Sequence, residues 1–194
     1  MRSGQLLEPP DSHRLNAAEA WLTLRNWREA KAELDHITEA NREHPAVLDA
    51  YADVCEVSQN WQEGARFMEA LITREPDNVD HWLRLHAALL FARRYPEACD
   101  CLEKALHRFP HHPALLFKLA VTSAQLGKYE NAGFVLYELF TTDGGKYRRT
   151  YLGMALDWKE FEPMRDRLLA WQKEFADAPG ETSEDAPPTN RTVL

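Results

Sequence analysis

An aromatic residue recurs along this chain at a nearly fixed interval. The interval is 34 residues three times and 32 residues once, which gives the positions Trp27, Trp61, Tyr95, Tyr129 and Phe161. Aromatic residues make up 10% of the sequence, so five of them in one register are expected by chance only about once in 10^5 trials. A period of about 20 to 50 residues is typical of proteins built from similar units, each packed on its neighbours. The period therefore predicts a repeat architecture.

The repeated unit predicts two helices joined by a tight turn. In residues 79–112 a first run of apolar residues has the spacing i, i+3, i+7 of one helix face: Trp82, Leu85 and Leu89. A second run has a similar helical spacing: Ala98, Leu102 and Ala105. Pro96 lies between the runs, where the first turn of a helix tolerates proline because its missing N–H needs no partner there. Pro110 ends the second helix.

The period and this pattern resemble the tetratricopeptide repeat, in which the second helix has a small residue followed four positions later by a large one. Five repeats then start at residues 11, 45, 79, 113 and 145. The small position holds Ala30, Gly64, Ala98, Ala132 and Met164, and the large one holds Leu34, Met68, Leu102, Leu136 and Leu168. The resemblance covers about residues 11–176. It implies an all-α fold, a right-handed α-solenoid of about five helix–turn–helix repeats.

The helices and the ends of the chain follow from this register. Asp11 or Ser12 is expected to cap the first helix, and the second helix is expected to run to about Asn41. The later helices are predicted at about 46–58, 62–74, 79–92, 96–108, 113–126, 130–142, 146–157 and 160–176. Residues 1–10 are predicted to be a flexible lead. Residues 177–194 contain three prolines, acidic residues and few large apolar residues, so we predict a disordered tail.

Composition limits the partners and the compartment. The 194-residue chain has a formal net charge of −8, which disfavours binding to the phosphates of nucleic acids. It contains no run of 18 apolar residues, so no membrane-spanning helix is predicted, and its first residues have no apolar run of signal-peptide length. We therefore expect a cytoplasmic protein. The odd number of cysteines, three, and their helical positions predict small buried thiols rather than a disulfide framework.

The resemblance also implies a binding surface. In the family, a concave face is lined by the first helix of each repeat. The corresponding positions here are acidic in repeats 1 and 2, apolar in repeats 3 and 4, and basic towards the C-terminal half. The predicted peptide-binding groove comprises Asp49, Asp53, Glu56, Leu83, Arg84, Ala87, Leu90, Phe91, Phe117, Lys118, Val121, Lys146 and Arg149.

Such a groove suits a helical or an extended segment of another protein, with apolar anchors in the middle and opposite charges at its ends. The alternative is that the apolar residues are ordinary core between helices and the charges solvate an exposed face. Some family members bind the acidic tails of heat-shock chaperones through a carboxylate clamp. The clamp positions here include Leu15, Glu19, Asp49 and Asp53, which cannot hold a carboxylate, so no clamp is expected.

The sequence contains no motif that supports catalysis. It has neither a phosphate-binding glycine loop nor a nucleophile elbow. His107, His111 and His112 cluster around Pro110, but no acidic or thiol ligand lies at a recognised spacing from them. We therefore expect no enzyme, no bound metal and no cofactor.

The last predicted helix offers a second interaction surface. Its large apolar residues are not followed by a polar capping helix, although such arrays usually need one. Leu168, Trp171 and Phe175 therefore either pack back on the array or meet a second copy of the chain. The favoured function is a scaffold, an adaptor or a targeting chaperone that binds a partner protein. The alternative is a structural subunit that self-assembles through this last helix.

Overall fold

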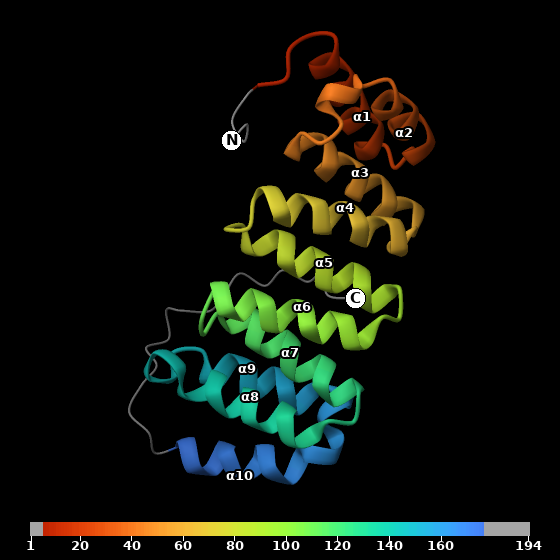
Figure 1. Cartoon of the computed structure of the whole chain (residues 1–194). Coiled ribbons are helices and arrows are strands. Elements are labelled where there is room, and N and C mark those ends of the chain that lie inside the picture. The colour runs from red at the N-terminus through yellow and green to blue at the C-terminus, as the bar shows by residue number, and fades with distance from the viewer. Residues whose placement is uncertain (1–5, 177–194) are drawn as a thin grey trace. The chain divides into compact units, whose positions relative to one another are not determined.

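The computed structural model describes residues 6–176, and the chain forms two compact units, one ending at Arg108 and the other beginning at Phe109 (Figure 1). The regular elements of the described residues are ten α-helices and three 3-10 segments. The predicted all-α fold of helical pairs is confirmed. The predicted disordered tail, and the first five residues of the predicted lead, lie outside the described residues. The described part of that lead contacts the first unit, because Leu7 packs on its core.

The first unit consists of three helical pairs. These are α1 (Asp11–Thr23) with α2 (Trp27–Asp35), α3 (Pro45–Ser58) with α4 (Trp61–Arg74), and α5 (Val79–Phe91) with α6 (Tyr95–Arg108). The helices of each pair pack on each other, and α2 packs on α3 and α4 on α5 (Figure 1). The core between the pairs is made of small and aliphatic side chains, among them the fully buried Ala30, Leu34, Ala65 and Leu71.

The turn inside each of the first four pairs has one conformation, repeated every 34 residues. One residue per turn has a positive φ: Arg25, Gln59, Arg93 and Gly127. The amide of the next residue donates a 2.9 Å hydrogen bond to the carbonyl five residues earlier: Asn26 to Trp21, Asn60 to Cys55, Arg94 to Leu89, and Lys128 to Ser123. This bond satisfies a carbonyl at the end of the first helix, as in a Schellman motif. The aromatic register residues Trp27, Trp61, Tyr95 and Tyr129 then begin the second helix of each pair.

The second unit contains one regular pair and one irregular pair. The regular pair is α7 (Pro113–Gln125) and α8 (Tyr129–Thr141), followed by the 3-10 segment η2 (Thr142–Gly145). The irregular pair is α9 (Arg148–Asp157), the 3-10 segment η3 (Lys159–Met164) and α10 (Arg165–Ala176). Fully buried side chains from both pairs form its core: Leu136, Phe140, Phe161 and Leu168.

The first pair starts at residue 11 as predicted, but its predicted cap and its predicted end are wrong. Pro10 occupies the N-cap of α1 and no side chain caps it, while α2 ends at Asp35 and a separate 3-10 turn, η1, covers Glu39–Asn41. The carboxylate of Asp11 explains both differences. It accepts hydrogen bonds from the amide and hydroxyl of Thr38 and from the side chain of Asn41. These bonds hold the segment after α2 against the start of α1, so the helix does not continue.

The last pair also departs from prediction. Its second helix was expected over 160–176, but residues 159–164 form 3-10 turns and the α-helix begins at Arg165. Pro163 lies inside the 3-10 segment and has no N–H to donate. This proline interrupts the α-helical hydrogen bonds, and Phe161 consequently precedes α10 instead of starting it.

Candidate protein-binding surface

An ion cluster joins α3 and α5 in the first unit. The guanidinium of Arg84 donates hydrogen bonds to Asp49 through Nη1 and to Asp53 through Nη2. Its Nη2 also lies 3.9 Å from Oε2 of Glu56. We call these four residues the acid cluster. One guanidinium and three carboxylates leave it with two negative charges.

Burial and charge oppose each other within the acid cluster. Burial raises the pKa of Asp53, and the nearby Arg84 only partly offsets this effect. Burial alone would lower the pKa of Arg84, but the carboxylates of Asp53, Asp49 and Glu56 reverse the shift, so that its pKa is raised. Arg84 therefore stays charged, and its charge is paired with carboxylates of the same chain. The expectation that it belongs to a basic end of the groove is corrected, because its charge is already used inside the cluster.

Beside Arg84, α5 presents a row of apolar side chains. Leu83, Ala87 and Leu90 are half-buried, and Phe91 is 44% exposed. The ring of Phe91 stacks on Trp61 at the start of α4, with 4.4 Å between ring centroids. We call Leu83, Ala87, Leu90 and Phe91 the apolar strip. Of the predicted groove residues, those in the first unit thus form an ion cluster and a partly exposed apolar strip on neighbouring helices.

The predicted apolar groove residues of the second unit are buried in its core. Phe117 is 4% exposed, and its ring centroid lies 5.1 Å from Tyr151, 5.5 Å from Trp158 and 6.1 Å from Phe161. Val121, on the same helix, is 5% exposed. Their assignment to an open groove is corrected, because aromatic residues of α9 and η3 cover this face of α7.

Three predicted basic groove residues lie in the second unit. Lys118, on α7, is half-buried, and burial lowers its pKa. Lys146 and Arg149 are exposed near the start of α9, and the ammonium of Lys146 lies 5.6 Å from the ring centroid of Tyr147. The two kinds of charge therefore lie in different units: the acid cluster is in the first unit, and these three cations are in the second.

The last helix packs back on its own unit. Leu168 and Trp171 are buried, and Trp171 contacts Tyr137 and Phe140 of α8 at centroid distances of 5.7 and 5.9 Å. Phe175 is half-buried and lies beneath the guanidinium of Arg148. Of the two alternatives for this helix, Leu168 and Trp171 follow the one in which they pack back on the array, and side chains of α8 contact Trp171.

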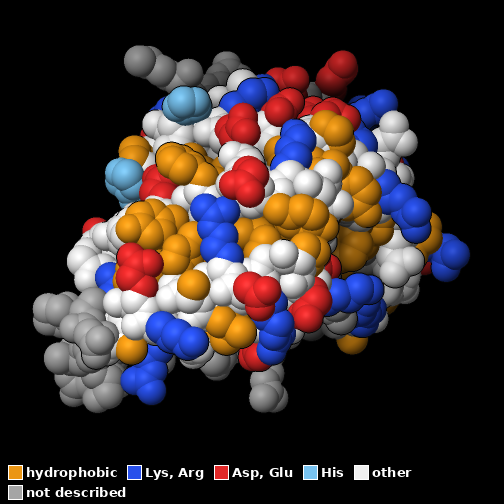
Figure 2. All heavy atoms as spheres, turned by 90° about the horizontal axis from the view of Figure 1, so that it is seen from below, with side chains coloured by type: hydrophobic (Ala, Val, Ile, Leu, Met, Phe, Trp, Pro, Cys, Tyr) orange, Lys and Arg blue, Asp and Glu red, His pale blue; other side chains and the backbone are white. Residues whose placement is uncertain are grey.

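Other large apolar side chains of the second unit remain exposed. They are Tyr129, Phe134 and Tyr137 on α8 and Leu169 on α10. Figure 2 views the molecule from below and shows a face on which apolar side chains are separated by lysine, arginine and acidic side chains. This mixture of apolar and charged side chains does not point to one occupant.

Sequence reasoning missed the role of Trp61 in this surface. Trp61 was recognised as a register residue, but its ring also supports Phe91 from the adjacent pair. The only signal was its place in the aromatic register. No group of three or more His, Cys, Asp or Glu side chains within residues 6–176 is arranged to hold a metal ion. Over the same residues, no helix has the length and apolar character needed to cross a bilayer.

The comparisons with known sequences agree with the repeat pattern. The family model for the tetratricopeptide repeat matches residues 87–141. Human cilia- and flagella-associated protein 70 is 33% identical over 85 residues, which are 44% of this chain and 8% of the human protein. The chain thus spans a small part of that relative's length.

Solved structures share the fold at low sequence identity. A crystal structure of MamA protein has a TM-score of 0.65 at 12% identity and covers 91% of this chain and 97% of its own. MamA 41-end from Desulfovibrio magneticus RS-1 has a TM-score of 0.63 at 15% identity, with 93% and 100% covered. YrrB, described as a TPR protein with an unusual peptide-binding site, has a TM-score of 0.56 at 15% identity, with 84% and 87% covered. Residues 87–141 thus match the tetratricopeptide repeat family, and the chain shares the α-solenoid fold of these solved structures.

Proposed function

We propose that this protein is an interaction scaffold, an adaptor or a targeting chaperone, which binds a segment of a partner protein over α3 and α5. The observation that carries the proposal is the apolar strip beside the acid cluster. Phe91 is 44% exposed although its ring is held in place by Trp61. A held aromatic side chain loses little conformational freedom on binding, and aromatic residues often dominate the energy of protein interfaces.

The charges define the partner segment. The acid cluster keeps two negative charges after Arg84 is counted, so basic residues of the partner are favoured next to its apolar anchor. Because Asp49, Asp53 and Glu56 are partly exposed, this attraction is screened by salt. Lys118, Lys146 and Arg149 favour acidic groups on a part of the partner that meets the second unit. The described peptide-binding site of YrrB supports a peptide-like ligand for this fold.

The proposal is tested by affinity capture from lysate of the source cells. Wild-type protein is compared with Phe91→Glu and with Phe134→Glu, which changes an exposed phenylalanine on α8. We expect at least one protein to be retained by wild type and by Phe134→Glu but reduced at least about tenfold by Phe91→Glu, as at an interface hot spot. Binding of the purified partner should also weaken when salt is raised from about 0.05 to 0.5 M.

The result is interpretable only if Phe91→Glu retains its helical circular dichroism. Phe117→Glu is unsuitable as a second groove variant, because Phe117 is a core residue and its charge would unfold the second unit. If a folded Phe91→Glu variant captures the same proteins in the same amounts as wild type, the apolar strip is a solvated face and the proposal is wrong.

A further inference from the structure

Two equivalent clefts lie on the first unit, each over the first helix of a repeat and between the second helices of successive repeats. The earlier cleft is formed by α2, α3 and α4 and has a volume of about 200 Å³. The later cleft is formed by α4, α5 and α6 and has a volume of about 290 Å³. Both have walls from second helices of the repeats, whereas the acid cluster lies on the first helices α3 and α5 alone.

The difference in volume follows from two substitutions between repeats. In the earlier cleft, Tyr51 and Phe67 stack with 4.9 Å between ring centroids and fill much of the space. The residues 34 positions later are Leu85 and Cys101, which are much smaller. The later cleft therefore lacks the pair of rings that fills its counterpart. Cavities of about 150 Å³ accommodate a benzene molecule, so the later cleft has room for a side chain.

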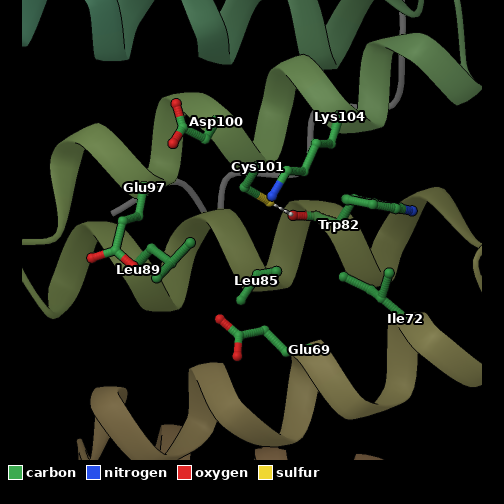
Figure 3. A pocket seen from close by; sticks show the side chains of 9 residues that line it. All are labelled: Glu69, Ile72, Trp82, Leu85, Leu89, Glu97, Asp100, Cys101 and Lys104. Carbon is green, nitrogen blue, oxygen red and sulfur yellow. Dashed lines mark hydrogen bonds between the residues drawn. The ribbon is translucent and has the colours of Figure 1, made fainter.

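The walls of the later cleft combine an apolar floor with facing carboxylates (Figure 3). Leu85 and Leu89 of α5 form the floor. Glu69 points in from α4 and Glu97 points in from α6, towards each other across these leucines (Figure 3). At the other end, Lys104 extends towards Cys101 and Trp82 (Figure 3). One end of the cleft is therefore acidic, and the other already contains a cation.

The carboxylate that precedes Glu69 by one repeat is neutralised, whereas that of Glu69 is not. In the earlier repeat, Asp35 forms an ion pair with Lys31 at 2.7 Å and accepts a hydrogen bond from the hydroxyl of Tyr51 at 3.0 Å. Glu69 is its equivalent 34 residues later, and the positions of Lys31 and Tyr51 are taken by Ala65 and Leu85. Within the described residues, the Glu69 carboxylate has no hydrogen-bond donor and no ion-pair partner.

The other charged residues around the later cleft leave its net charge negative. Arg94 binds Glu97, with 2.7 Å between Nε and Oε1, and acts on Glu69 from a greater distance. Asp100 also lines the later cleft and adds a carboxylate, whereas the residue 34 positions earlier is Arg66. Glu69, Glu97 and Asp100 against Arg94 and Lys104 leave one net negative charge.

We propose that this cleft binds a lysine or arginine side chain of a partner protein. The aliphatic stem lies over Leu85 and Leu89 in the space that Tyr51 and Phe67 fill in the earlier repeat. The terminal cation meets the unpaired carboxylate of Glu69 beside Glu97. Long cationic side chains suit such a place because their methylene stems pack on apolar surface while the charged end stays with a counter-ion.

Small probes test the chemistry directly on the full chain. Amide NMR spectra are recorded with hexylammonium, hexan-1-ol and hexanoate, which share an alkyl stem and differ in the charge of the head group. We expect hexylammonium to cause saturable shifts centred on Glu69, Leu85, Glu97 and Cys101. Hexan-1-ol should bind more weakly and hexanoate should not bind.

Two variants locate the binding and the charge. Cys101→Phe restores the aromatic residue of the earlier cleft and should abolish the hexylammonium shifts. Glu69→Gln keeps the space and should reduce the preference for hexylammonium over hexan-1-ol by about two- to fivefold, the range of partly exposed ion pairs. Glu103→Gln, an exposed acid on α6 outside the cleft, is the charge-matched control and should leave the preference unchanged.

Each contrary outcome overturns the proposal. If hexylammonium produces no localised shifts, the cleft does not bind such a side chain. If hexan-1-ol or hexanoate binds as well as hexylammonium, the occupant is not a cation. The proposal stays testable if Cys101→Phe does not fold. An equal loss of the preference for hexylammonium in Glu69→Gln and Glu103→Gln would then disprove the role of the cleft, because Glu69 lines the cleft and Glu103 does not.

Discussion

At the scale of single residues, Asp11 shows how one buried carboxylate organises the first pair of helices. It is 2% exposed, and Thr38 and Asn41 donate three hydrogen bonds to it, from Thr38 N at 3.1 Å, Thr38 Oγ1 at 2.5 Å and Asn41 Nδ2 at 2.7 Å. The hydroxyl of Thr38, followed by Asn41, holds the pKa of Asp11 below the ordinary value of 3.8. The charged form is therefore the form that stabilises the fold.

We predict that Asp11→Ala lowers the free energy of unfolding of the first unit by about 2–3 kcal/mol at neutral pH, because it leaves Thr38 and Asn41 without their charged acceptor. Since the pKa is lowered in the folded state, the contribution of Asp11 is complete above pH 3.8 and is lost as the pH falls through the folded-state pKa. Urea unfolding of both proteins from about pH 7 to pH 2.5 should show a constant difference that shrinks below pH 3.8. A difference that stays constant to the lowest pH would contradict the charged role.

At the scale of elements, the repeated turn explains why the helical pairs are regular. Arg25, Gln59 and Arg93 adopt the left-handed conformation at a cost, whereas Gly127 adopts it freely in the equivalent turn, with φ at +72°. A Cβ atom added at Gly127 would contact nothing within 4 Å. Any penalty for a side chain there must therefore come from the backbone and not from packing.

We predict opposite effects for two glycine substitutions. Gly127→Ala should destabilise the second unit by about 1 kcal/mol, because alanine is strained at positive φ. Gly153→Ala should stabilise it by about 0.5–1 kcal/mol, since Gly153 lies inside α9 and an added Cβ also meets nothing within 4 Å. Thermal unfolding measures both. The same sign for both substitutions would show that the turn is not the cause.

At the scale of the whole molecule, the chain contains two compact units that each have their own buried residues. The ring of Trp171 contacts Tyr137 and Phe140, and both of these residues belong to the second unit. Its removal leaves a cavity between α8 and α10. Leu169, on the same helix, is 38% exposed and makes a matched control.

We predict that Trp171→Ala destabilises the second unit by about 3–5 kcal/mol, as expected for a buried tryptophan. Hydrogen exchange should become faster in residues 109–176 and remain near its wild-type rate in residues 11–108. Leu169→Ala should change exchange little in either unit. An equal loss of protection in both units would mean that they unfold as one cooperative structure.

The sequence by itself determined the helical pairs, their register and their turns. These features depend on spacing along the chain: Trp27, Trp61, Tyr95 and Tyr129 begin their helices because each follows an identical turn. The end of α2 and the start of α10 escaped prediction, because the first depends on hydrogen bonds to a distant residue, Asp11, and the second on the placement of Pro163.

Only the tertiary structure decided which side chains of the candidate surface are available. Helical spacing places Phe117 and Phe91 on comparable faces of α7 and α5, but aromatic residues of α9 and η3 cover Phe117, while Phe91 is left 44% exposed. In the same way, spacing placed Arg84 in a line of positive charges, and only its contacts with Asp49 and Asp53 show that its charge is already paired. The physical reason is that periodicity specifies the direction of a side chain from its helix, whereas burial and charge pairing depend on what other segments bring to that side.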